Sequence, residues 1–214
     1  MSKTKAKYVP SQVVLMEDGK WGEHYTDKMM DKLEAHKKGV LHSGFVIMVV
    51  DRDGIVLGKR ADNKHIWPGF WDGTLASHLA LPLKDFSLQK YTQAVHDRVE
   101  LELGLPKNST KMDPIKRSFF YYKAKCPVTD LYEHEWCDVG LAYYNGVVKD
   151  PHNDEISVVK HIATAGEIDR FEFETVTPWF LIFMARLLGT SLDYLSDVDT
   201  FVGPERFGLR TWHV

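Results

Sequence analysis

At 214 residues, with 44% hydrophobic and 27% charged residues, the chain has the length and composition of a single soluble domain. Its formal net charge of -3 excludes the basic composition of a general nucleic-acid binder, so we expect no nucleic-acid partner. No apolar run approaches the roughly 20 residues of a membrane span, and the N-terminus lacks a signal peptide's apolar core, so we expect a cytoplasmic protein.

The chain divides into three expected parts. Residues 1–12 have the composition of a polar arm, residues 13–199 form the domain, and residues 200–214 form a C-terminal tail. Neither an internal repeat nor a low-complexity linker interrupts the domain.

The first elements of the domain are predicted from caps and apolar runs. Thr26 is expected to cap a helix that continues to about His36, and Gly39 is expected to end it. Apolar, β-branched runs at residues 45–51 and 55–59 are joined by an Asp-Gly pair, which predicts a β-hairpin.

The second half of the domain alternates helices and strands. Ser87 is expected to cap a helix that closes at Gly104, and Thr177-Pro178 has the residues that open a helix. Strands are expected at residues 118–125, 132–144 and 157–162. This order predicts an α/β (α+β) domain in which helices flank a mixed β-sheet.

Three histidines and two glutamates are candidate metal ligands: His36, His42, His78, Glu133 and Glu135. The two glutamates are two residues apart on a predicted strand, so their side chains share a face. Imidazole nitrogen with carboxylate oxygen suits zinc, manganese, iron or magnesium better than copper. The spacing alone favours the simpler interpretation, in which these histidines are structural and the glutamates form a solvated face.

Four basic residues could together bind a group with several negative charges: Lys32, Arg60, Lys64 and Arg98. Lysine, arginine and Mg²⁺ together are what holds such a group. Lys32 lies one helical turn before His36, and Arg98 lies four residues before Glu102 on one helix face. Taken singly, each of these charges is more simply explained as solvated surface.

Four stretches of the sequence contain or adjoin these candidates: residues 35–42, 67–78, 132–135 and 177–179. Together they resemble the type 1 isopentenyl diphosphate isomerases, in collinear order over roughly residues 12 to 190. The resemblance implies a Nudix-like fold and an enzyme of isoprenoid biosynthesis. The implied reaction is isomerisation of isopentenyl and dimethylallyl diphosphate, by proton addition and removal on a small isoprenoid substrate.

The resemblance also implies roles for the candidate residues. His36, His42, His78, Glu133 and Glu135 would hold a divalent metal (Zn²⁺, Mn²⁺ or Mg²⁺), and Lys32, Arg60, Lys64 and Arg98 would bind the diphosphate. Glu102 would bind a separate Mg²⁺. Glu135, Tyr122 and Trp179 would be catalytic: Glu135 transfers the proton, Tyr122 is its partner, and the Trp179 ring faces the hydrocarbon. A ring face stabilises a carbocation by about 2 kcal/mol or more when water is excluded.

Ala76 stands at the position where the resemblance places the family's catalytic cysteine. Moving a double bond needs one acid and one base, and alanine can be neither. Another group can take the role, and the candidates are a magnesium-held water, Asp72, Ser77 and Cys137. Alternatively, Glu135 protonates the substrate and the cation follows another fate, such as cyclisation. We expect the first, because the metal and diphosphate residues all remain.

A third interpretation is a Nudix hydrolase or a non-catalytic diphosphate binder. Residues 102–105 match the end of the Nudix box, but Asp97-Arg98 and Leu101 stand where hydrolases carry Arg-Glu and a further Glu. The carboxylates that a hydrolase needs are therefore mostly missing.

Overall fold

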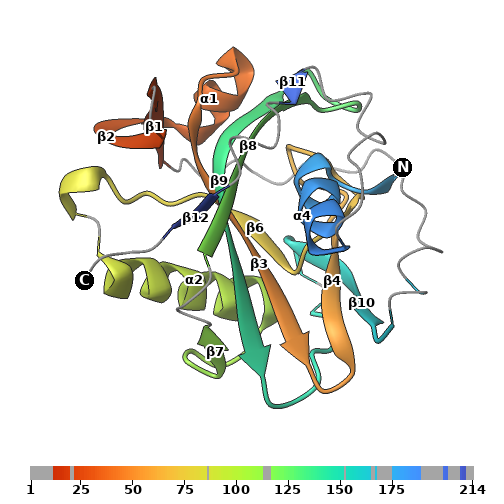
Figure 1. The fold of residues 1–214 in the computed structure, drawn as a ribbon. Coiled ribbons are helices and arrows are strands. Elements are labelled where there is room, and N and C mark those ends of the chain that lie inside the picture. Colours follow the sequence, from red (N-terminus) through yellow and green to blue (C-terminus); the bar gives the residue numbers. More distant parts are fainter. Residues whose placement is uncertain are drawn as a thin grey trace.

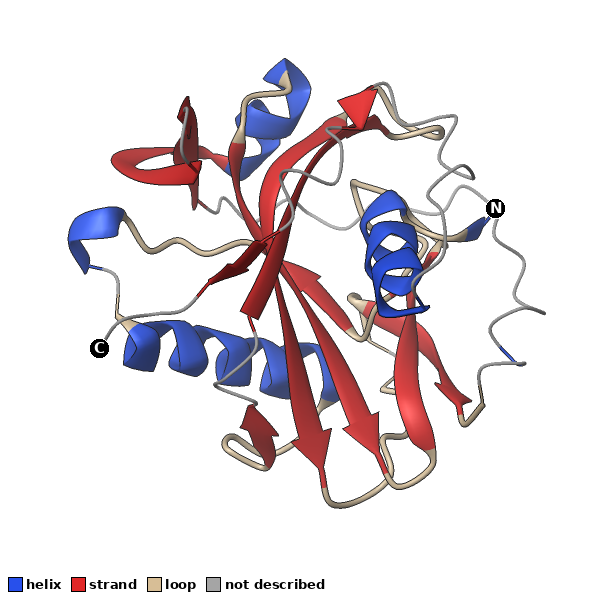
Figure 2. Cartoon of the chain, viewed as in Figure 1, coloured by secondary structure: helices blue, strands red, loops and turns tan. Residues whose placement is uncertain are grey.

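A mixed β-sheet runs through the middle of the molecule and carries a helix on each face (Figure 1). The computed structural model describes residues 12–19, 22–85, 87–112, 117–151, 153–164, 167, 175–188, 200–201 and 208–210. The central strands are, in spatial order, β10 (Ile156–Ile162), β4 (Gly54–Arg60), β3 (His42–Asp51), β9 (Tyr132–Tyr144), β8 (Arg117–Lys125) and β11 (Thr200–Phe201). Only the β3–β9 pair in this series is parallel. The predicted mixed sheet with flanking helices is confirmed (Figure 2).

The two helices pack against opposite faces of β3. Val46 and Met48 belong to the apolar cluster that contains α4 (Pro178–Leu188), whereas Phe45 and Ile47 belong to the cluster that contains α2 (Leu88–Leu103). This alternation follows from the two-residue period of a strand. Each such side chain contributes roughly 1.5–3 kcal/mol by leaving water.

Both predicted ends of α2 and the predicted start of α4 are confirmed. The Ser87 hydroxyl accepts a hydrogen bond from the Lys90 amide at 3.2 Å, and Gly104 ends the helix in the left-handed conformation at φ 66°. Pro178 is the first residue of α4, where its missing N–H costs nothing.

The prediction of a helix from Thr26 is wrong over its first half. Residues Gly22–Asp31 form strand β2, which pairs antiparallel with β1 (Gln12–Gly19), and the helix α1 covers only Lys32–Lys38. The Thr26 hydroxyl donates to the Leu15 carbonyl across this hairpin at 2.8 Å, and Asp31 is the residue that caps α1. Pairing with β1 outweighs the local helix preference. The predicted end at Gly39 is confirmed.

Short strands and a 3-10 turn complete the described chain. They are β5 (Trp71–Asp72), β6 (Leu75–Ser77), η1 (Leu83–Asp85), β7 (Thr110–Met112) and β12 (Gly208–Arg210). β6 pairs with β3, and the register sets Ala76 opposite Val46. From the expected C-terminal tail, β11 and β12 pair with β8. Of the expected N-terminal arm, residues 1–11 lie outside the described residues.

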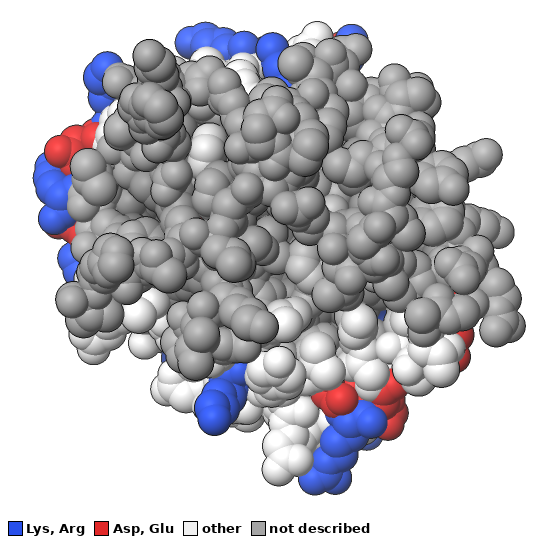
Figure 3. Space-filling model, viewed as in Figure 1, with Lys and Arg blue, Asp and Glu red and all other residues white. Residues whose placement is uncertain are grey.

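The visible surface carries charges of both signs. On the face drawn in Figure 3, described basic and acidic side chains lie beside one another along the rim. Among the helices that the structure describes, none is long and apolar enough to cross a membrane.

Candidate functional site

A cavity of about 490 Å³ lies where the first residues of β9 meet α1, the end of β6 and the loop after β4. Most residues singled out from the sequence line it, including Ala76, Glu135 and Trp179. His42, Tyr122 and Glu102 are not in its wall. The sheet and helices therefore bring candidates from distant parts of the chain to one place.

Three imidazoles surround one carboxylate beside this cavity. Glu133 Oε2 lies 3.0 Å from His36 Nε2, 3.7 Å from His42 Nε2 and 3.8 Å from His78 Nε2. One ligand atom from each of the four residues falls within 4.8 Å of all the others. Such separations suit groups that share one cation at roughly 2 Å from each ligand atom.

Two of the histidines, His36 and His42, are oriented by their second ring nitrogen. His36 Nδ1 donates to the Lys32 carbonyl at 2.5 Å, and His42 Nδ1 donates to the Val40 carbonyl at 2.7 Å. Metal-binding histidines commonly make this contact, because it leaves the Nε2 lone pair directed at the ion. The Nε2 atoms of His42 and His78 are buried and, within the described residues, make no hydrogen bond of acceptable geometry. The cluster is therefore compatible with a divalent metal.

Glu135 borders the cluster on the cavity side. Its Oε1 lies 2.8 Å from His78 Nε2, and its Oε2 accepts a hydrogen bond from the Tyr122 hydroxyl at 2.5 Å. The side chain lies over Gly44, where an added Cβ would come within 2.5 Å of Glu135 Cδ. The absence of a side chain at Gly44 therefore leaves the space that the Glu135 carboxylate occupies.

Burial and charge set the protonation states of these groups. Burial raises the pKa of Tyr122 well above its usual value, and Glu135 raises it further, so the phenol keeps its proton and donates it. Burial alone would raise the pKa of Glu133, but His36 and the other imidazoles hold that pKa well below its usual range. Burial lowers the pKa of His36, which favours the neutral imidazole that binds metals.

The predicted diphosphate-binding side chains all line the cavity. Burial, followed by the nearby charge of Lys64, lowers the pKa of Lys32 to about 8. Repulsion from Arg98 and Arg60 lowers this pKa further, so several positive charges lie close to Lys32. Within the described residues, Lys32 has no carboxylate at ion-pair distance.

The other three cations are paired with carboxylates. Arg98 Nε donates to Glu102 Oε1 at 2.7 Å, and Lys64 contacts Glu155. Arg60 Nη1 donates to Asp72 Oδ2 at 2.9 Å. Glu102 is 4% exposed and its carboxylate pairs with Arg98, and the separate Mg²⁺ expected at this residue remains a prediction.

Three titratable residues of the cavity wall were not predicted from the sequence: His65, Asp154 and Glu155. All lie in irregular segments between strands, where no hydrophobic period directs attention to a side chain. Only the fold brings these residues to the cavity, because strand β10 places the segment that precedes it beside the loop that follows β4.

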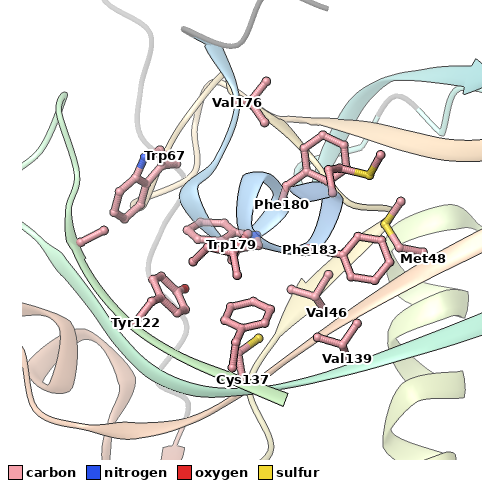
Figure 4. Close-up of a cluster of buried hydrophobic side chains, with 14 of the residues drawn as sticks. Val46, Met48, Trp67, Tyr122, Cys137, Val139, Val176, Trp179, Phe180 and Phe183 are labelled. Atoms are coloured by element: carbon pink, nitrogen blue, oxygen red, sulfur yellow. The ribbon is translucent and has the colours of Figure 1, made fainter. Parts of the chain in front are cut away.

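Trp179 is fixed in the cavity wall by a buried network around Asp72. Asp72 Oδ1 accepts from Trp179 Nε1 at 2.6 Å and from the Thr177 hydroxyl at 3.2 Å. Burial raises the pKa of Asp72 to about 6, although Arg60 and these donors oppose the rise. Figure 4 shows Trp179 beside Trp67, and their ring centroids are 5.2 Å apart.

Two of the side chains considered as substitutes for the missing thiol lie outside the cavity wall. Asp72 is engaged in the network above, and Cys137 is fully buried among apolar side chains (Figure 4). Ser77 does line the cavity. The wall at Ala76 itself offers only a methyl group.

Fold and site together define a mixed α+β protein with an imidazole–carboxylate centre beside a basic cavity. The chain is 30% identical over 180 residues to an isopentenyl-diphosphate Delta-isomerase of Ruegeria pomeroyi, covering 82% of this chain and 88% of the relative. It is 31% identical over 164 residues to the protein of the same name from Haloarcula marismortui, covering 74% of this chain and 83% of the relative. The chain belongs to the isopentenyl-diphosphate Delta-isomerase family.

Two further comparisons complete this result. No protein-family model matches the chain. A crystal structure of a Nudix hydrolase from M. smegmatis is 12% identical, with a TM-score of 0.47, over 83% of this chain and 92% of that one.

The imidazole–carboxylate cluster predicts about one tightly held divalent ion per chain in protein purified without added metal. His42→Ala or Glu133→Gln should abolish it, because each removes a ligand and leaves the others too few. Elemental analysis of the purified variants measures this. His161→Ala, which removes an imidazole paired with Asp51 outside the cluster, should keep the ion. Full occupancy in both ligand variants would refute the metal site.

The close approach at Gly44 predicts a specific cost for Gly44→Ala. The new methyl group must displace the Glu135 carboxylate, and we expect unfolding free energy to fall by about 1–3 kcal/mol. Urea unfolding measures the change. Gly58→Ala on the neighbouring strand is the control, since its Cβ would meet the movable end of Ile156 at 3.2 Å and the Thr74 carbonyl oxygen at an ordinary contact distance of 3.4 Å. Equal losses in the two variants would contradict the steric argument.

Proposed function

We propose that this chain is a metal-dependent enzyme that binds isopentenyl or dimethylallyl diphosphate and moves a proton on and off the alkene. The supporting observation is the position of Glu135, whose carboxylate lines a cavity bordered by both the imidazole cluster and the basic side chains. The relatives from Ruegeria pomeroyi and Haloarcula marismortui, named as isomerases of this diphosphate, support the same substrate class.

Binding of the diphosphate is assigned to the basic part of the wall. Lys32, Lys64 and Arg98 supply N–H donors to phosphate oxygens, and charge-assisted hydrogen bonds of this kind are the strong ones. Arg60 has a more limited role, because it already donates to Asp72 and to the Ile66 and Trp67 carbonyls. We propose that it mainly holds the loop and the Trp179 ring, 5.3 Å from its guanidinium carbon.

Proton transfer is assigned to Glu135. Tyr122 holds one carboxylate oxygen in place, and the other lies beside His78 on the cavity side. A metal held by the three histidines and Glu133 would supply a fixed positive charge next to this carboxylate. Trp179 offers an aromatic surface to the cation that protonation creates.

The second proton-transfer group must differ from the family's thiol, since the wall at Ala76 carries none. Among the side chains first considered, Ser77 has access to the cavity, whereas Asp72 and Cys137 do not line it. His65 also lines the cavity and can accept a proton. We propose that the non-cysteine acid or base comes from this part of the wall.

The binding assignment predicts that Lys32→Met weakens binding of isopentenyl diphosphate by about 1.5–3 kcal/mol, the scale of a hydrogen bond to a charged group. Titration calorimetry measures the dissociation constant. Lys37→Met on the same helix is the matched control, because that ammonium is exposed and paired with Glu34 at 3.2 Å. If both variants bind like the parent, Lys32 does not contact the diphosphate.

The proton-transfer assignment predicts that Ala76→Cys raises isomerisation of isopentenyl diphosphate, by ~10²–10⁴-fold for a well-positioned acid or base. Glu135→Gln should silence both the parent and the cysteine variant. The assay is deuterium incorporation into dimethylallyl diphosphate in heavy water. Ala163→Cys, which adds a thiol at an exposed position, should leave the rate unchanged.

The same incubation separates the alternative reactions. Release of inorganic phosphate would identify a hydrolase, a new carbon skeleton would identify a cyclase, and binding without turnover would identify a non-catalytic binder. If Ala76→Cys remains inactive while metal and diphosphate still bind, the geometry is not that of an isomerase.

A further inference from the structure

We infer that Glu155 determines the form of diphosphate that the cavity accepts. Its carboxylate repels a free diphosphate and favours one chelated by a divalent cation. This inference rests on the proposed function, because it takes the basic part of the wall as the diphosphate site, and it gives Glu155 a specificity-determining role.

Glu155 differs from the other carboxylates that pair with the basic side chains. Asp72 and Glu102 are 3% and 4% exposed and lie outside the cavity wall. They therefore pair with Arg60 and Arg98 without facing the cavity. The Glu155 side chain is 27% exposed and lines the cavity. Among the carboxylates paired with these cations, it is therefore the one that phosphate oxygens in the cavity would meet.

The Glu155 carboxylate lies beside two of the four basic side chains. One oxygen contacts Lys64 Nζ and lies 3.4 Å from Arg98 Nη2. Burial alone would raise the pKa of Glu155, but Lys64, Arg98 and Lys32 hold the pKa below its ordinary value. The group is thus ionised at neutral pH, and it occupies donors that a diphosphate requires.

The backbone of Glu155 is fixed at this place by Asn153. The Asn153 side-chain oxygen accepts hydrogen bonds from the amides of Glu155 at 2.9 Å and Ile156 at 2.8 Å. Its side-chain nitrogen donates to the Glu102 carbonyl at 3.0 Å, and the Ala61 amide donates to the Glu155 carbonyl at 3.0 Å. These bonds join α2, which carries Arg98, to the loop that carries Lys64, and the carboxylate stays between them.

A diphosphate entering this site faces two opposing effects. Lys32, Lys64 and Arg98 attract it, whereas the Glu155 carboxylate, beside two of those cations, repels it. A divalent cation placed between the carboxylate and the phosphate oxygens turns the repulsion into attraction. Mg²⁺ suits this position, because it is usually bound by one or two carboxylates together with phosphates. Asp154 in the same wall provides a further carboxylate.

The test is calorimetric titration of inorganic pyrophosphate into the full-length chain, in Mg²⁺-free buffer and in saturating Mg²⁺. The parent should bind more tightly with Mg²⁺. In Glu155→Gln, binding without Mg²⁺ should strengthen roughly tenfold, and the gain from Mg²⁺ should shrink by a similar factor, because the amide neither repels phosphate nor attracts the cation. The proposed role of Glu155 requires both the tighter binding without Mg²⁺ and the smaller gain from Mg²⁺. Glutamine keeps the size of the side chain and can still accept from Lys64.

The matched control is Glu34→Gln, which removes an exposed carboxylate paired with Lys37 and Lys38 outside the cavity. Its dissociation constants should equal those of the parent in both buffers. An unchanged Mg²⁺ dependence in Glu155→Gln, with normal binding by the parent, would overturn the role of Glu155 and leave the proposed function intact. If the parent binds neither pyrophosphate nor isopentenyl diphosphate under either condition, both proposals fail together.

Discussion

The parallel pairing of β3 with β9 is the constraint on which the site depends. It sets His42 level with Glu135, and it brings Gly44 beneath the Glu135 carboxylate. Since side chains alternate along a strand, a slip of one residue would turn Glu133 and Glu135 to the opposite face. Two candidate metal ligands, His42 and Glu133, and the proposed proton-transfer group Glu135 thus depend on one strand register.

The face of β9 opposite the carboxylates fixes the helix that supplies His36. His134, between the two glutamates, donates from Nδ1 to the Gly39 carbonyl at 2.8 Å, and its Nε2 lies 2.6 Å from the Tyr121 hydroxyl. Gly39 ends α1 in the left-handed conformation at φ 60°. Strand β9 therefore presents Glu133 and Glu135 on one face. Its other face binds the end of α1, the helix that carries His36 toward these carboxylates.

Local signals predicted the elements whose ends are determined by their own residues. The Ser87 cap, the glycine at position 104 and the Asp-Gly hairpin gave correct ends because each acts within a few residues. The helix predicted from Thr26 failed because strand pairing with β1, a contact from outside that segment, decides its structure. A single sequence carries no comparable signal for such pairing.

The residues of the candidate site could be predicted from the sequence because the chain resembles a known enzyme family. Spacing alone did not separate the candidate ligands from structural histidines and a solvated strand face, and the geometry now groups three imidazoles with Glu133. Glu155 shows the limit of this approach. Its importance comes from contacts with Lys64 and Arg98, respectively 91 and 57 residues away in the chain, and no local pattern marks it.

The alanine at position 76 is compatible with this fold because the carboxylates of the candidate site rest on a different strand. β3 and β9 hold His42 and the carboxylates, whereas Ala76 lies on β6 and packs against the apolar cluster around Trp179. A methyl group there fits that cluster and demands no polar partner. Position 76 can therefore change its chemistry while Glu133, Tyr122 and Glu135 keep their contacts with one another and with His42. Under the proposed function, the residues of β3 and β9 would bear on metal binding and proton transfer, and the residue at position 76 would bear on the fate of the bound substrate.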